Sequence, residues 1–378
     1  MSQEFKRKLA AYEKGELTGK VLEDFEKELE KLESYHELLE DDTDKQPTTI
    51  LSNKKQKKIM KRGKWKARIQ TAFTAIGIFI IFTIVSSILT AIYYSWGNPD
   101  RVDVFRGIID HTLTVTDPYG YLGGTSMNSK AYYGLEATRD INKKVGNESI
   151  KVGELEINFI LSLMGMPEED YLGKITQNQP SFFYPGDANG NMSDWNKLDK
   201  LPEGTVVSAY ISFDELMETK EVEQLFANKE MNLLWLVVDT GLEGTDDWYV
   251  FEPIGFPSSP IWHDDDMILQ SSEEEKGLFG SGTKSESYSS PGYHEGDQSV
   301  LHEQFLKTLN FLKEHERKAN NLVFGKLRLS ERIDYLEKNG IQHYGVVITG
   351  PTKEILKLQD EPRVSALEVD EVEFWNWD

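Results

Sequence analysis

The segment that decides the fold runs from Ile69 to Tyr94 and reads IQTAFTAIGIFIIFTIVSSILTAIYY. No charged residue occurs between Arg68 and Asp100. Because a helix rises about 1.5 Å per residue, ~20 apolar residues suffice to cross ~30 Å of hydrocarbon. A core helix of a soluble protein rarely stays uncharged for so long, and a signal peptide would not begin this far into the chain. The segment therefore predicts one transmembrane helix over residues 69–95.

The charges that flank this span are unequal. Nine lysines and arginines lie from Lys54 to Arg68, whereas the charges of Asp100, Arg101, Asp103 and Arg106 cancel on the other side. Cytoplasmic flanks of membrane helices carry the excess of Lys and Arg. We therefore expect a single-pass protein of the cell membrane, with residues 1–68 in the cytoplasm and the C-terminus outside.

Small residues occur within the span at Thr71, Ala75, Ser86, Ser87 and Ala91. They either form a face for close approach to another helix or reflect ordinary membrane composition. The sequence leaves both readings open.

The composition supports the division at the membrane. The whole chain has a net charge of −22. Residues 1–68 carry +3, so the residues after Arg68 carry −25. An acidic exterior argues against direct binding of nucleic acid. The chain contains no cysteine, which excludes disulfides, thiolate metal sites and a cysteine nucleophile.

The interior segment, residues 1–45, predicts a small helical module. Apolar residues recur at helical spacing, and Gly15 separates two helices. The pair is too short to bury an ordinary core. It either packs on itself as a hairpin or is completed by a protein partner, and we favour the partner. The candidate contact residues are Phe5, Leu9, Tyr12, Leu22, Phe25, Leu29 and Leu32, and the pattern continues to His36 and Leu39.

Residues 46–68 predict a polar linker followed by a basic helix that runs into the span. Its lysines are expected to lie along anionic lipid headgroups. The membrane is thus a further expected partner.

The exterior predicts a mixed α/β domain, so the whole chain is classed as α+β. Residues 97–200 give weak signals, with strands expected at His111–Thr116 and Glu154–Leu161. From residue 201 to 378 the pattern is sharper. It predicts strands at Thr205–Phe213, Asn232–Asp239, Ile341–Thr349 and Ala366–Trp375, and helices at Thr219–Phe226, 299–316, Ser330–Lys338 and after Pro351.

Two strand–helix–strand units follow from these signals, and they suggest a twisted, ferredoxin-like sheet with helices on one face. Thr-Lys-Glu opens both helices, at 219–221 and 352–354, which is either a degenerate repeat or chance. Residues 257–297 are rich in Ser, Gly and acids and predict a mobile loop.

Sequence motifs that would indicate catalysis or a bound cofactor are matched only in part. Gly277–Ser285 resembles a phosphate loop, but its lysine falls one position late. Ser281 and Lys284 have the spacing of penicillin-recognising enzymes without the helix that would join them. The acids Asp264–Asp266 after His263 read as a solvated loop more readily than as a cation site. We expect no catalytic, cofactor or metal site.

Several stretches resemble the YhdL-type anti-sigma factors, a family of sigma factor regulators with N- and C-terminal domains. They are FKRKLAAYEKGEL and FEKELEKLESYHELL near the N-terminus, LPEGTVVSAYISFD, ETKEVEQLF and EPIGFP in the exterior, and RIDYLEKNGIQHYGVVITGPTKE with VEFWNW at the end. The resemblance covers residues 1–95, 201–257 and 330–377.

The resemblance implies that residues 1–45 bind an extracytoplasmic-function sigma factor like sigma M and keep it from RNA polymerase. The exterior would then answer to envelope stress or to a second small membrane protein. Two other classes remain open: an envelope-interaction protein without sigma binding, and an ectoenzyme that acts on wall or lipid.

Overall fold

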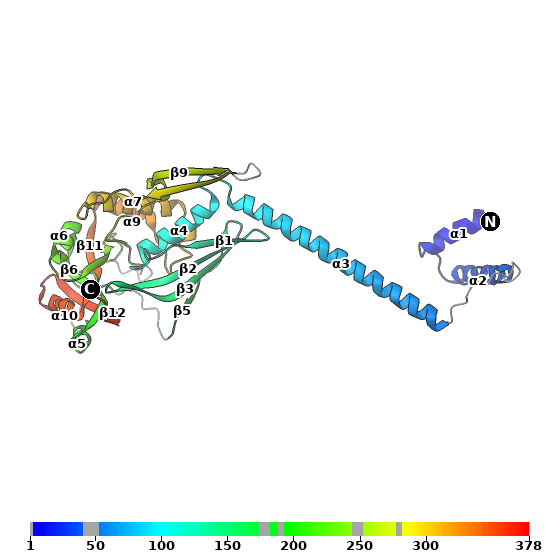
Figure 1. The fold of residues 1–378 in the computed structure, drawn as a ribbon, viewed down its shortest axis with the longest axis horizontal. Helices are drawn as coiled ribbons and strands as arrows, with labels where there is room; N and C mark the ends of the chain where they lie inside the picture. The colour runs from blue at the N-terminus through cyan, green and yellow to red at the C-terminus, as the bar shows by residue number, and fades with distance from the viewer. Residues whose placement is uncertain are drawn as a thin grey trace. The chain divides into compact units, whose positions relative to one another are not determined.

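The computed structural model describes residues 3–40, 53–173, 182–187, 193–243, 252–276 and 282–377 (Figure 1). It divides into two compact units, Met1–Gly77 and Ile78–Asp378. The first holds α1 (Gln3–Glu13), α2 (Lys20–Glu40) and the start of α3 (Asn53–Tyr94). The predicted class, with N-terminal helices, one candidate membrane helix and a sheet-rich remainder, is confirmed.

In the first unit, α1 and α2 are separate helices, as the apolar spacing predicts. Gly15 has a φ of +68°, and the amide of Glu16 donates to the carbonyl of Ala11 at 2.9 Å. A positive φ is easy for glycine and ends α1 at the predicted turn.

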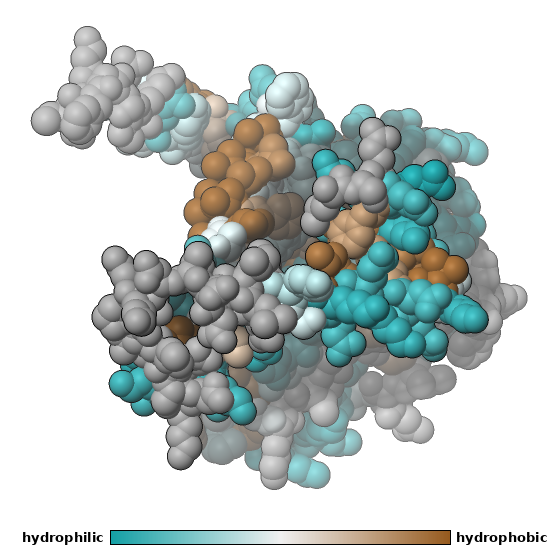
Figure 2. Space-filling model, turned by 90° about the vertical axis from the view of Figure 1, so that its right-hand side faces the viewer, coloured by the Kyte–Doolittle hydropathy of each residue, from teal (hydrophilic) through white to brown (hydrophobic). Residues whose placement is uncertain are grey.

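Helix α3 joins the basic segment and the apolar span in one run of 42 residues. Among the described residues, one helix is long and apolar enough to cross a membrane, and it covers Lys57–Tyr94. Its apolar side chains are largely exposed, for example Phe73, Ile78, Phe79, Ile81 and Phe82. Figure 2 shows one broad apolar area and smaller apolar patches on the face it draws. Bare apolar surface of this extent fits lipid and not water.

The second unit begins with a helix and a five-stranded antiparallel sheet, called sheet A. The elements are α4 (Arg101–Thr116), β1 (Ser126–Lys130), β2 (Gly134–Val145), β3 (Glu148–Ile160), β4 (Leu163–Met164) and β5 (Glu168–Tyr171). The strand predicted at 154–161 is confirmed as part of β3. The strand predicted at His111–Thr116 is wrong, because these residues end α4. Its buried residues Phe105, Ile108, Ile109 and Thr112 follow the helical period, which outweighs the β-branched residues near its end.

The remaining elements complete the second unit. They are α5 (Trp195–Asp199), β6 (Thr205–Glu218), α6 (Thr219–Phe226), β7 (Asn232–Val238), β8 (Gly255–Pro257), the 3-10 turn η2 (Asp264–Asp266), β9 (Ile268–Lys276), β10 (Gly282–Ser289), α7 (Gln298–Glu314), α8 (Glu316–Ala319), α9 (Leu329–Asn339), β11 (Gln342–Pro351), α10 (Thr352–Leu356), η3 (Lys357–Asp360) and β12 (Val364–Phe374).

A second antiparallel sheet, sheet B, has the order β12-β6-β11-β7-β8. Strands β6 and β7 flank β11, and each pairs with it antiparallel. Both predicted strand–helix–strand units are present, and the first four strands have the split arrangement of a ferredoxin-like sheet. One face of sheet B packs against α6, α7, α9 and α10 in a large apolar core. Tyr210, Trp235 and Tyr344 pack on the other face, so the central strands are buried on both sides.

The segment predicted as a mobile loop, residues 257–297, contains more regular structure than expected. Strands β9 and β10 pair antiparallel from Ile268–Lys276 to Gly282–Ser289. Their described side chains are exposed, so the apolar periodicity that identifies a buried strand is missing. The predicted mobility of this hairpin stays a prediction.

Candidate functional site

Helices α1 and α2 meet through three aromatic rings. The ring of Phe25 lies 5.5 Å from that of Phe5 and 5.6 Å from that of Tyr12. Phe25 is 2% exposed, the one fully buried apolar side chain among those described in the first unit. Leu9, Leu22 and Leu29 are partly buried. The predicted contact residues therefore include several that the helix pair uses for its own packing.

A second part of the α2 stripe remains exposed. Val21 is 54% exposed, Leu32 44% and Tyr35 69%. At about 100° per residue, Val21 and Leu32 differ by ~20° around the helix, and Tyr35 stands beside them. We call these three residues the α2 strip. Sequence reasoning singled out Leu32 but missed Val21 and Tyr35, which lie just off the strict three–four spacing. The side chains of His36 and Leu39 are outside the described set.

The end of α3 is bound to the tips of sheet A. The amide of Tyr132 donates to Ser86 Oγ at 2.7 Å, and the amide of Tyr133 donates to Thr90 Oγ1 at 2.8 Å. The Tyr94 hydroxyl lies 2.9 Å from the carbonyl oxygen of Tyr133, to which it donates. We call this contact the helix–turn junction. It makes the last turns of α3 part of the second unit.

The backbone at the junction has unusual geometry. Tyr132, Tyr133 and Leu161 have φ values of 64°, 59° and 55°. Residues with a Cβ rarely adopt this left-handed region, which costs on the order of 1 kcal/mol each. The carbonyl of Leu161 accepts a hydrogen bond from Tyr94 at 3.1 Å. Hydrogen bonds from the side chains of α3 thus stabilise a left-handed backbone conformation that would be unfavourable in an isolated turn.

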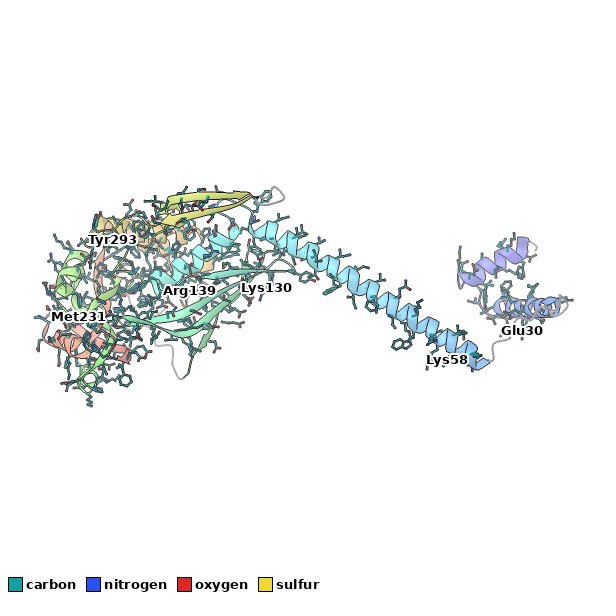
Figure 3. All side chains as sticks on the ribbon, in the orientation of Figure 1. Glu30, Lys58, Lys130, Arg139, Met231 and Tyr293 are labelled. Carbon is teal, nitrogen blue, oxygen red and sulfur yellow. The ribbon has the colours of Figure 1, made fainter. Side chains whose placement is uncertain are left out.

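Helix α4 continues the packing behind the junction. The rings of Phe105 and Phe159 stack at 5.0 Å, and Tyr94 is 1% exposed in the same cluster. Lys130, at the outer end of β1, and Arg139, further along β2, are labelled in Figure 3. Arg139 is buried and pairs with Asp110 of α4. A buried ion pair of this kind fixes α4 on the sheet, since removing either partner leaves the other charge unpaired.

A second buried ion pair joins the two sheets. Lys143 of β2 contacts Asp370 of β12 at 2.7 Å, and the Tyr119 hydroxyl donates to the same carboxylate at 2.8 Å. Burial is the largest single influence and disfavours the Lys143 charge, but the carboxylates of Asp370 and Glu371 together outweigh it and raise the pKa of Lys143. Sheet A and sheet B are therefore connected by charge as well as by packing.

Two of the three acids after His263 pair with one lysine. Lys307 of α7 contacts Asp265 at 2.8 Å and Asp266 at 2.7 Å. Within the described part of the chain, no three His, Asp or Glu side chains gather as metal ligands. Lys284 lies on β10, and Ser281 is outside the described residues.

Comparisons with known proteins match most of the chain. The family model described as sigma factor regulator N-terminal matches residues 57–150, and the one described as sigma factor regulator C-terminal matches residues 198–371. A Bacillus subtilis (strain 168) protein named "Probable anti-sigma-M factor YhdL" is 29% identical over 388 residues, with both chains covered completely. No solved structure matches. Helices α1 and α2 lie outside both family models and are matched by the relative.

Proposed function

We propose that the helix pair α1–α2 holds a sigma factor, because the chain belongs to the sigma factor regulator family and is a membrane-anchored anti-sigma factor. The observation that supports this location is the α2 strip, Val21, Leu32 and Tyr35. Among residues 3–40, no further layer covers this apolar strip, and so small a helix pair buries little by itself. A sigma factor that covered the strip would complete the core and be kept from RNA polymerase.

The partner we propose is an extracytoplasmic-function sigma factor of the sigma M class. The name of the relative supports this class, since it is an anti-sigma-M factor by name and matches from end to end. The proposed anchors are Leu32, Tyr35, Val21 and the half-exposed Tyr12. Phe5, Leu9, Leu22, Phe25 and Leu29 serve binding indirectly, because they hold the two helices together.

The proposed orientation places α1 and α2 in the cytoplasm, where sigma factors act. The basic residues of α3 before Ile69 support this side, and the acidic second unit would lie outside. We propose that this exterior domain regulates and does not catalyse. It would respond to envelope stress itself or through a second small membrane protein.

The direct test uses the full chain in membranes. Leu32→Ala with Tyr35→Ala removes the exposed part of the strip and leaves Phe25 in place. Alanine at a binding hot spot costs ~2 kcal/mol or more, so capture of the sigma factor should fall about 30-fold or further. Lys27→Ala with Glu30→Ala is the matched control on the exposed polar side of α2, where Figure 3 labels Glu30.

The measurement is the amount of sigma factor that co-purifies with detergent-solubilised chain, together with transcripts of its target genes. The strip variant should release the sigma factor and raise the transcripts, while the control should do neither. Equal capture by both variants at equal protein level would refute the assignment of the strip.

A further inference from the structure

We propose that the tips of sheet A insert into the membrane leaflet beside α3. These tips, called the apolar tips below, are the β1–β2 turn at 130–134 and the segment Ile160–Met166. The proposed ligand is the acyl region of a phospholipid leaflet. The inference needs α3 to cross a membrane and does not depend on sigma factor binding.

The apolar tips carry large exposed side chains. Ile160 is 64% exposed, Leu163 66% and Met166 78%, and Tyr132 in the other tip is 45% exposed. No charged residue occurs between Glu156 and Glu168, and none occurs between Lys130 and Glu136. A cluster of bare apolar side chains rimmed by charges marks a contact surface and not a face exposed to water.

The place of the tips along α3 selects the membrane as the occupant. The hydroxyls of Tyr132 and Thr83 lie 2.7 Å apart, and the rings of Tyr132 and Phe82 are 5.9 Å apart. Counted from Arg68, ~20 residues cross the hydrocarbon and reach about Ile88, which puts Thr83 about 7 Å below the far boundary. A tilted helix would use more residues and place Thr83 deeper. A turn that contacts Thr83 therefore lies within the leaflet.

Helix α3 pairs the amides of Tyr132 and Tyr133 and the Tyr133 carbonyl, which is the kind of pairing that lipid demands of a turn. Irregular backbone is tolerated at membrane depth only where protein groups satisfy it, since each unpaired polar group there costs several kcal/mol. The α3 hydroxyls of Ser86 and Thr90 accept from the Tyr132 and Tyr133 amides. The amide of Gly134 donates to the carbonyl of Ala131.

The second tip is satisfied in the same way. The amide of Leu161 donates to the carbonyl of Tyr133 at 2.9 Å, and the Tyr94 hydroxyl donates to the Leu161 carbonyl. The Ser162 and Tyr93 hydroxyls lie 2.8 Å apart. The polar groups named here are thus paired with α3 or with the other tip, while the large apolar side chains of the tips are exposed. Insertion would hold the domain at a fixed depth in the leaflet beside α3. A change in the thickness or packing of the leaflet would then act on the domain and on α3 together.

The absence of cysteine gives a clean test. Leu163→Cys and Met166→Cys each place one thiol on an exposed tip position, and Phe374→Cys is the control on β12 of sheet B, where the side chain is 83% exposed. Each full-length variant carries an environment-sensitive fluorophore. The variants are reconstituted in phosphatidylcholine–phosphatidylglycerol vesicles, with or without lipids brominated on the acyl chains.

We expect brominated lipid to quench the two tip labels at least twofold and to leave the Phe374→Cys label unchanged. Iodide in the water should show the reverse order. Tip labels that iodide quenches as readily as the control would overturn the proposal. Tip labels shielded from both quenchers would also overturn it, because a second copy or another protein would then cover the tips.

Discussion

The α1–α2 pair and the second unit differ in how far each supplies its own core. In the pair, Phe25 is the one described apolar side chain that is fully buried, and Tyr35 is 69% exposed. In the second unit, β6 and β11 are buried on both faces, by helices on one side and by aromatic residues on the other. A segment that lacks a core gains stability by binding, whereas one with a full core can change its contacts without unfolding.

The largest effect on the free energy of unfolding is expected from truncating a fully buried side chain of the second unit. Trp235 is fully buried, and its indole N–H donates to the Thr114 carbonyl at 3.1 Å. Trp235→Ala should lower the free energy of unfolding of this unit by about 4 kcal/mol, since truncating a buried aromatic leaves a cavity. Phe374→Ala, on an 83% exposed side chain, is the control and should change it little.

Denaturant unfolding of the full chain in detergent, followed by tryptophan fluorescence, measures this difference. Capture of the sigma factor should be retained in both variants while the unit is folded. If Trp235→Ala abolished capture before unfolding, the two regions would not be separable as described.

The next effect concerns the helix pair. Phe25→Ala removes the ring that Phe5 and Tyr12 share, at a cost of ~3 kcal/mol to a module with little else to hold it. We expect loss of protection of the α1 and α2 amides in hydrogen exchange together with loss of sigma factor capture. Tyr35→Ala should lower capture alone. Equal exchange and equal capture in the two variants would contradict the division between packing and binding residues.

The sequence predicts elements better than their contacts, and the two regions show why. Helix α6 begins and ends as predicted, because a strand on each side and an apolar face at helical spacing define it locally. In α2 the whole apolar stripe is visible, but which part faces α1 depends on the packing of two helices. That packing buries Phe25 and leaves Tyr35 exposed.

The helix–turn junction was beyond sequence reasoning for a similar reason. In the sequence, Ser86 is compatible with contact to another helix or with ordinary membrane composition, and nothing distinguishes Thr90 from its neighbours. Tyr132 and Tyr133 adopt a left-handed backbone that glycine usually signals. The partners lie more than forty residues apart, so only the folded chain brings them together.

A smaller effect should appear at this junction. Thr90→Val removes the acceptor of the Tyr133 amide, and a buried donor left unpaired costs ~1–3 kcal/mol. Thr74→Val is the control in the same helix, because the Thr74 hydroxyl donates to the Gln70 carbonyl within α3. Faster hydrogen exchange at residues 131–135 in Thr90→Val alone is the expected result. Equal exchange in both variants would mean that the hydroxyl does not support the turn.

Counted over a single pH unit, the smallest effect is a pH dependence of the second unit. His343 is fully buried, its Nε2 lies 2.8 Å from Thr219 Oγ1, and its Nδ1 lies 3.1 Å from the Val237 carbonyl. Burial lowers the pKa of His343 from 6.5 to about 3. The unfolded chain therefore takes up a proton below pH 6.5 that the folded chain does not, and stability present above 6.5 is lost toward pH 3 at about 1.4 kcal/mol per pH unit.

Other titratable groups also modify this slope, and His111 and Asp117 have the large shifts among them. Burial also lowers the pKa of His111 to about 3, which adds to the loss. Burial raises the pKa of Asp117 from 3.8 to about 6, so its protonation stabilises the fold as the pH falls through that window and opposes the histidines. His343→Gln should reduce the slope of unfolding free energy against pH by about one proton between pH 6 and 4. His294→Gln, at an exposed histidine, is the matched control. The comparison uses the slope of unfolding free energy against pH, so a general loss of stability in His343→Gln would not imitate the expected result. An unchanged slope in that variant would show that His343 is not held neutral in the folded chain.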